Sequence, residues 1–305
     1  MRWRRMQERT CNERIHNFNN KQFLIIRMKK HFVYLFFALG IILLGRCDVI
    51  EGPYLEDNHN GGTVVEKSLK NILVMEFTGH TCKSCPKAHR TIDQLESIYE
   101  GRLISVAFHT GYFARTLSGE KFTRDFRTTQ GAEMENYFEF ASFPIGLVGN
   151  LDKARLSSYS SWPAEADDFL NSESSVDVST ASSYDENTKE IEVKVNLINR
   201  ISLEGEIRLA VYLVEDNIVS WQKDEDQDPI DVEDYIHNHV FRTSAGSVWG
   251  EGLSESDCSA NANVQIRKTL VMNPLWIPEN CTVIAFLYDF ESREVIQCSS
   301  ELLIK

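Results

Sequence analysis

The hydrophobic pattern of the chain begins with two nearly continuous apolar runs, at 71–78 and 103–108. Runs of this length without alternation are typical of strands that are buried on both faces. Between them, apolar residues recur every three or four positions, the spacing of one helix face: Ala88, Ile92, Leu95, Ile98 and Tyr99. Gly101 is then the expected end of this helix. The pattern predicts a strand–helix–strand unit with parallel strands.

Three further elements extend this unit into an α/β segment. The pattern predicts a helix within 126–140, a strand within 142–149 that is entered through Pro144, and an acidic helix over 162–170. We therefore expect an α/β domain over residues 67–172.

The pattern changes near residue 172, where the Ser-rich stretch NSESSVDVSTASS indicates a boundary. Beyond it, short strands alternate apolar and polar positions, and turn signals separate them. The clearest are 190–197, 207–214, 265–272, 282–288 and 294–303. About seven strands in this stretch predict an all-β, immunoglobulin-like sandwich over residues 173–305.

The N-terminal region carries a targeting pattern. Lys29 and Lys30 precede an uncharged apolar run that ends at Gly45. This run has the length of a signal-peptide core and is short for a membrane helix, which needs about 20 residues. The sequence Leu-Gly-Arg-Cys at its end resembles a bacterial lipobox, so Cys47 is the predicted lipidation site. A cleaved soluble protein and an uncleaved anchor are the alternatives.

This reading divides the N-terminal region into three parts. Residues 1–27 precede a complete signal peptide and are interpreted as a mis-called start. Residues 28–46 are the predicted lipoprotein signal peptide. Residues 47–66 are acidic and contain a proline, which is typical of a linker.

Charge is unevenly distributed around a formal net charge of -13. Residues 1–46 hold ten Lys/Arg and two acids, so 22 basic and 43 acidic residues remain from Cys47 onward, a net charge of -21. A body this acidic repels phosphate backbones, which excludes nucleic acid as an expected partner.

Cys82 and Cys85 form a CxxC motif at the predicted start of the first helix. Backbone N–H groups and the helix dipole there favour a thiolate, so Cys82 is the candidate nucleophile and Cys85 the resolving cysteine. Lys83 and His80 are expected to add positive charge beside an exposed Cys82 sulfur. The alternatives are a static disulfide and half of a zinc site, although no second ligand pair follows at zinc spacing.

The stretch ILVMEFTGHTCKSCP resembles the active-site region of thioredoxins. The resemblance implies that Glu76 is the buried acid beneath the dithiol and accepts the proton from Cys85. It also implies that Pro144 is the cis-proline that faces the dithiol and guides the substrate backbone.

A longer pattern extends this resemblance over residues 47–305. The lipobox, EFTGHTCKSCP, SFPIGLVGN, DYIHNHVFR and IAFLYDFESREVIQ together are similar to the outer membrane protein twenty-eight family of bacterial lipoproteins. The family implies an α/β thioredoxin-like domain followed by an all-β immunoglobulin-like sandwich, at the outer membrane of the cell envelope and facing either the periplasm or the surface.

Other candidate ligands are weaker. His237 and His239 would share one face of a strand, where they could bind a metal or serve as ordinary structural histidines. The acidic stretch 224–234 could hold calcium or form a solvated loop. We predict no metal and no cofactor. Cys258, Cys281 and Cys298 are an odd number, so two of them could pair and their pairing stays open.

Two functions remain. The first is extracytoplasmic thiol–disulfide exchange on exported proteins through Cys82 and Cys85. The second is a non-catalytic, adhesin-type lipoprotein that binds a surface ligand, with the CxxC pair as a structural disulfide. In both, the lipid anchor provides the contact with the membrane.

Overall fold

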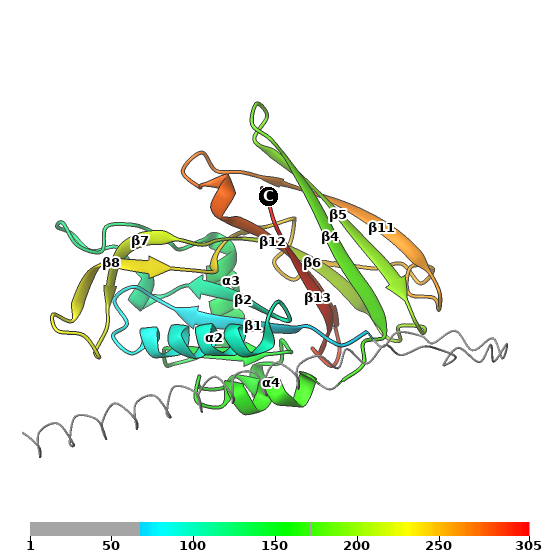
Figure 1. Ribbon diagram of the computed structural model, residues 1–305, viewed down its shortest axis with the longest axis horizontal. Coiled ribbons are helices and arrows are strands. Elements are labelled where there is room, and N and C mark those ends of the chain that lie inside the picture. The colour runs from blue at the N-terminus through cyan, green and yellow to red at the C-terminus, as the bar shows by residue number, and fades with distance from the viewer. Residues whose placement is uncertain (1–67, 171, 305) are drawn as a thin grey trace, which may run out of the picture. The chain divides into compact units, whose positions relative to one another are not determined.

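The computed structural model describes residues 68–304 except residue 171 (Figure 1). The predicted mis-called start, the signal peptide, the lipidation site Cys47 and the linker lie outside the described residues. Within the described part of the chain, no helix is long and apolar enough to cross a membrane.

The first half of the described chain contains the predicted elements in the predicted order. These are β1 (Ile72–Thr78), α2 (Cys85–Tyr99), β2 (Leu103–His109), α3 (Thr129–Phe138), β3 (Ile145–Val148) and α4 (Trp162–Leu170). Gly101 follows the end of α2 with a φ of 75°, a conformation that glycine adopts without strain. The apolar face of α2 packs with α4 on one face of β1.

The second half is richer in strands than predicted. The strands are β4 (Val176–Asp185), β5 (Glu190–Asn199), β6 (Ile207–Glu215), β7 (Ile218–Lys223), β8 (Asp231–His237), β9 (Val240–Ser244), β10 (Glu251–Gly252), β11 (Asn263–Val271), β12 (Cys281–Asp289) and β13 (Val295–Leu302). The Ser-rich stretch taken as a boundary contains most of β4, which pairs antiparallel with β5 along its whole length. Small polar side chains are compatible with the exposed face of β4, so the serine-rich composition was wrongly interpreted as a boundary where a strand lies.

One large sheet crosses the position where the sequence pattern changes. Its order is β13-β12-β6-β9-β2-β1-β3, with β10 paired to β6. β1 and β2 are parallel, as predicted, and β3 is antiparallel to β1. β9 joins β2 through the pair Ala107 and Val240, so strands from both halves of the chain share the sheet. A second sheet has the order β11-β5-β4, and β7 and β8 form a separate hairpin.

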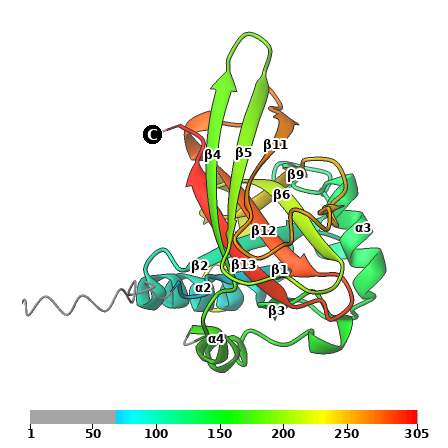
Figure 2. The same cartoon turned by 90° about the vertical axis from the view of Figure 1, so that its right-hand side faces the viewer.

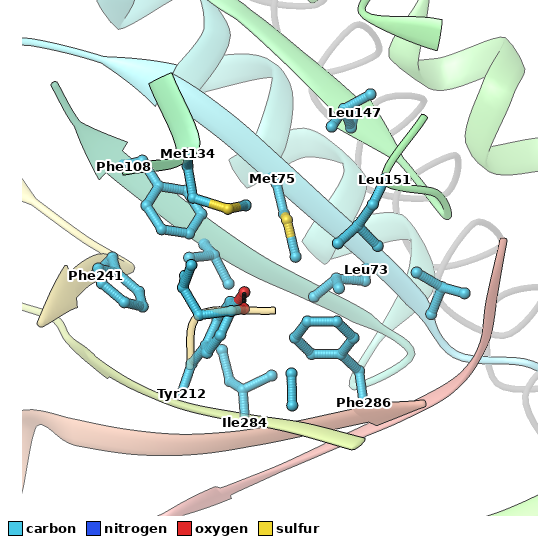
Figure 3. Close-up of a cluster of buried hydrophobic side chains, with 14 of the residues drawn as sticks. Leu73, Met75, Phe108, Met134, Leu147, Leu151, Tyr212, Phe241, Ile284 and Phe286 are labelled. Carbon is cyan, nitrogen blue, oxygen red and sulfur yellow. Dashed lines mark hydrogen bonds between the residues drawn. The ribbon is translucent and has the colours of Figure 1, made fainter. Parts of the chain in front are cut away.

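Strands β6 and β12 are buried on both faces and separate two cores. On one face, Tyr212, Ile284 and Phe286 meet Met75 and Phe108, with further side chains from α3 and β3 (Figure 3). On the other face, alternate residues of the same strands pack against the sheet β4-β5-β11 (Figure 2). The described residues therefore form a mixed α/β, β-rich fold.

Candidate functional site

The CxxC motif lies at the beginning of α2, as predicted. Cys85 is the first residue of the helix, Cys82 lies three residues earlier, and their sulfurs form a disulfide. The exposed fractions are 2% for Cys82 and 0% for Cys85. The expectation of an exposed Cys82 sulfur is therefore wrong for this structure.

A hairpin from the second half of the chain covers the motif. We call residues 218–237, which comprise β7, the acidic tip and β8, the cap hairpin; it lies beside α2 and β2 in Figure 1. Lys223 N donates to the carbonyl of His80 at 2.9 Å. Glu225 N donates to the carbonyl of Lys83 at 2.9 Å. Gln222 Nε2 donates to the carbonyl of Cys82 at 3.0 Å. The hairpin thus contacts three of the four residues of the loop 80–83, all except Thr81.

Ion pairs fasten the acidic tip of the cap hairpin to α2. Arg90 contacts Asp224 at 2.8 Å and Asp226 at 2.5 Å, and Lys87 contacts Glu225 at 2.8 Å. Asp224 is only 2% exposed. Three acids at the start of the stretch are therefore paired with basic residues of the helix, while residues 225–230 are exposed to solvent as expected of a loop.

The expected positive neighbours of Cys82 do not supply charge to its sulfur. The Lys83 side chain is 65% exposed and its ammonium lies 3.6 Å from a Glu225 oxygen. His80 is 0% exposed, and its Nε2 donates to the carbonyl of Arg115 at 2.9 Å. Burial lowers the pKa of His80, which favours the neutral ring. The electrostatic argument for a stabilised thiolate is weakened by both contacts.

Glu76 is a buried acid, in agreement with the resemblance to thioredoxins, and is 2% exposed. Its Oε1 lies 3.2 Å from Nε2 of His89, whose Nδ1 lies 2.6 Å from the hydroxyl of Tyr235. Nε2 also lies 3.0 Å from Thr78 Oγ1. With the proton on Nε2, His89 donates to Thr78 and Tyr235 donates to His89. This chain joins β1, α2 and the cap hairpin. Glu76 Oε2 has no hydrogen-bond partner among the described residues.

Pro144 follows a cis peptide bond with Phe143, the isomer that the resemblance implied. The ring of Phe143 lies 5.4 Å from that of Phe113. The carbonyl of Phe113 accepts hydrogen bonds from Thr81 N at 3.0 Å and Thr81 Oγ1 at 2.8 Å. The proline is thereby connected, through one aromatic contact, to the loop that carries Cys82.

His237 and His239 do not share a strand face, contrary to expectation. β8 ends at His237, and His239 has a φ of 56° in the turn that follows. His237 is buried against the rings of His109 and Phe126. Burial, followed by the nearby His89 and His80, lowers the pKa of His237 to about 3. His239 points instead toward α2, where its Nε2 lies 3.3 Å from Glu96 Oε1.

The remaining described cysteines, Cys258, Cys281 and Cys298, are buried free thiols. Burial, together with Glu215, raises the pKa of Cys281 to about 12. These thiols are therefore poor nucleophiles at neutral pH.

Comparison with known families agrees with the motifs. The family described as Outer membrane protein Omp28 matches residues 131–303, more than half of the chain. The chain belongs to the Omp28 family. Membership identifies this Omp28-family protein as an outer membrane protein of the cell envelope, which confirms the predicted location. No curated protein matched the chain in a sequence comparison.

Solved structures show a similar fold. HBP35 of Porphyromonas gingivalis aligns with a TM-score of 0.58 and 15% identity, covering 78% of this Omp28-family chain and 76% of its own. A domain of the outer membrane lipoprotein Omp28 from Porphyromonas gingivalis aligns at 19% identity, covering 43% and 89%, with a TM-score of 0.30. A protein from Agrobacterium tumefaciens aligns at 14% identity, covering 79% and 97%, with a TM-score of 0.49. Only the first similarity is strong enough to support an argument about the fold.

Several residues of this Omp28-family site carry no local signal in the sequence. Each of three residues forms a hydrogen bond with a partner more than 130 positions away in the sequence, and no local pattern predicts these contacts. They are Gln222, Arg90 and Tyr235. A helical projection could have found Asp93 and Glu96, because residues three apart on a helix share a face.

Proposed function

We propose that the protein is a non-catalytic binding lipoprotein of the outer membrane whose Cys82–Cys85 disulfide is a structural bond. In this proposal, residues 67–172 are a thioredoxin-like domain and residues 173–305 an immunoglobulin-like sandwich. The parallel β1-α2-β2 unit, the antiparallel β3 after the cis-proline and the two-sheet packing of the second half support this architecture. The fold similarity to HBP35 is consistent with it.

The observation that carries the proposal is the burial of Cys82. Thiol–disulfide exchange requires one sulfur to reach another, so both the attacking thiolate and the attacked disulfide must be accessible. Cys82 is 2% exposed, and the cap hairpin is bonded to the loop on both sides of it. The same bonds hold the loop at the start of α2, where a disulfide adds a further covalent constraint.

A second candidate is thiol–disulfide exchange on exported proteins after the cap hairpin opens. The unpartnered Glu76 Oε2 favours it, because a buried carboxylate oxygen without a hydrogen bond is costly and such groups occur at functional sites. In the reduced protein, the Cys82 thiolate would attack a substrate disulfide, forming a mixed disulfide and releasing one substrate thiolate. The Cys85 thiol, deprotonated by Glu76, would then attack the Cys82 sulfur, which forms the Cys82–Cys85 disulfide and releases the second substrate thiolate. The dithiol thereby supplies the two electrons that the substrate gains.

One experiment separates these candidates. The full chain, purified in detergent, is assayed for insulin reduction and for its redox potential, beside Cys82→Ser and the control Cys258→Ser. Absence of turnover and a potential below about -300 mV are expected for a structural disulfide. Turnover that is lost in Cys82→Ser and retained in Cys258→Ser would establish the second candidate instead.

The lipid anchor is the remaining part of the proposal. Cys47 is proposed to carry it, and the surface ligand to be bound by the folded part of the chain. Mass spectrometry of the mature N-terminus tests the anchor: a diacylglyceryl-modified Cys47 is expected, and an unmodified N-terminus at another residue would refute it.

A further inference from the structure

We propose that Asp93, Glu96 and His239 bind a first-row divalent cation such as Zn²⁺ or Mn²⁺. One ligand atom from each of the three residues lies within 4.8 Å of the others. Asp93 and Glu96 are three apart on α2, so both carboxylates lie on one face of the helix. His239 approaches that face from the turn between β8 and β9.

The ligand atoms are already oriented by neighbouring groups. His239 Nδ1 lies 3.4 Å from Asp216 Oδ1, which leaves Nε2 directed at Glu96. Asp216 Oδ1 also accepts the backbone N–H of His239 at 2.6 Å. Ser105 Oγ donates to Glu96 Oε1 at 2.9 Å. A carboxylate behind a ligating imidazole, and a donor to a ligating carboxylate, are the usual supports of protein metal sites.

An independent observation points to a ligand at the same place. A cavity of about 40 Å³ adjoins the cluster and is lined by Glu76, His89, Asp93 and His239, among others. Glu76 is 2% exposed, and its Oε2 has no hydrogen-bond partner among the described residues. A buried carboxylate oxygen without a partner is unfavourable, and a cation or a cation-bound water in the cavity would satisfy it.

The donor set indicates the type of cation. One imidazole with two or three carboxylates suits Zn²⁺, Mn²⁺ or Fe²⁺, since imidazole favours transition metals and carboxylates accept harder ions as well. Mg²⁺ and Ca²⁺ prefer all-oxygen sites. Without a cation, a protonated His239 between Glu96 and Asp216 accounts for the geometry, and that ion pair is the alternative to be tested. The inference goes beyond the proposed function and holds whether the disulfide is structural or reactive.

Two titrations of the EDTA-treated full chain test the site. Binding of ZnCl₂ is measured by calorimetry, and binding of MnCl₂ is measured by electron paramagnetic resonance. One cation per chain is expected. His239→Gln, Asp93→Asn and Glu96→Gln should each weaken binding at least tenfold, and Glu186→Gln, an exposed turn residue, should leave it unchanged. Circular dichroism of each metal-free variant checks folding. The electron paramagnetic resonance spectrum of bound Mn²⁺ distinguishes coordination by nitrogen and oxygen ligands from coordination by the cysteine thiols.

Three outcomes would overturn the proposal. They are no uptake by the wild-type chain, equal affinity in all three ligand variants, and binding that is lost only when Cys258 or Cys281 is replaced. Glu76→Gln provides a further check: weaker Mn²⁺ binding with unchanged folding is expected if its Oε2 faces the cation, and unchanged binding would remove Glu76 from the site.

Discussion

The side-chain amide of Gln222 donates a hydrogen bond to the backbone carbonyl of Cys82 at 3.0 Å, across 140 positions of sequence. The same nitrogen lies within hydrogen-bond distance of the carbonyls of Lys223, at 2.8 Å, and Gly79, at 3.5 Å. One buried side chain therefore ties the CxxC loop to the cap hairpin. It adds to the two backbone hydrogen bonds, from Lys223 N and Glu225 N, that hold the hairpin against the loop.

Replacing Gln222 with alanine is expected to expose the disulfide. The change removes the side-chain donor to the carbonyl of Cys82, which keeps only a 3.4 Å bond from Cys85 N. The loss costs about 0.5–1.5 kcal/mol and loosens the cap hairpin. Reduction of Cys82–Cys85 by dithiothreitol, followed by alkylation and mass spectrometry, should become several-fold faster than in the wild type. Gln265→Ala, an exposed glutamine on β11, is the control. Equal reduction rates in all three proteins would show that the hairpin does not protect the disulfide.

The first half of the fold could be predicted because its signals are local. Apolar runs mark β1 and β2, and the three- and four-residue spacing marks α2. The cap hairpin could not be predicted in the same way. β8 has the sequence DVEDYIH, in which only one of seven residues is buried, so no apolar alternation marks it. It is held in place by backbone hydrogen bonds and ion pairs with a distant helix.

The candidate site shows the same division. The CxxC pair at a helix start followed from the local sequence pattern. The burial of Glu76 and the cis bond before Pro144 followed from the resemblance to thioredoxins. The exposure of Cys82 did not, because burial depends on what packs over a residue, and the covering segment lies in the other half of the chain.

Arg242→Met is expected to destabilise the protein strongly. Arg242 Nη2 and Nε each lie 2.7 Å from Glu215 Oε2, and both side chains are buried. Removing the guanidinium leaves the buried Glu215 carboxylate without its cationic partner, which costs about 3–5 kcal/mol. Arg267→Met breaks an exposed pair with Glu192 and should cost less than about 1 kcal/mol. Urea denaturation measures both, and a similar loss in the two variants would contradict the prediction.

His109 is expected to make the fold sensitive to acid. It is 4% exposed, and neither ring nitrogen has a partner among the described residues. Burial, with further contributions from His237, His89, His80 and Arg242, lowers its pKa well below 6.5. Below pH 6.5, His109 of the unfolded chain binds a proton, whereas His109 of the folded chain stays neutral. The contribution of His109 to stability is therefore intact above pH 6.5 and is lost as the pH falls.

His109→Phe should remove this acid sensitivity. Relative to wild type, the free energy of unfolding of the variant should rise as the pH falls from 7 to 5, by at most about 2 kcal/mol, since each pKa unit is worth about 1.4 kcal/mol. Urea denaturation at a series of pH values provides the measurement. Phe122→Leu, a non-titrating change in the neighbouring aromatic cluster, should give an offset that does not vary with pH. Parallel curves for wild type and His109→Phe would refute the assignment.

Gly79→Ala is expected to disturb the loop that supports Cys82. A Cβ at this position would lie 2.4 Å from the backbone carbon of Phe113 and 2.6 Å from the nitrogen of Ala114. Because these are backbone atoms, no side-chain rotation relieves the clash, and we expect a loss of about 1–3 kcal/mol. Gly252→Ala adds a methyl group with nothing within 4 Å and should change stability by less than about 0.5 kcal/mol. Thermal and urea denaturation compare the two variants.

Displacement of Phe113 should also weaken its hydrogen bonds to Thr81, so faster disulfide reduction is expected in Gly79→Ala alone. Unchanged stability and an unchanged reduction rate would show that the backbone at Phe113 yields without affecting the CxxC loop.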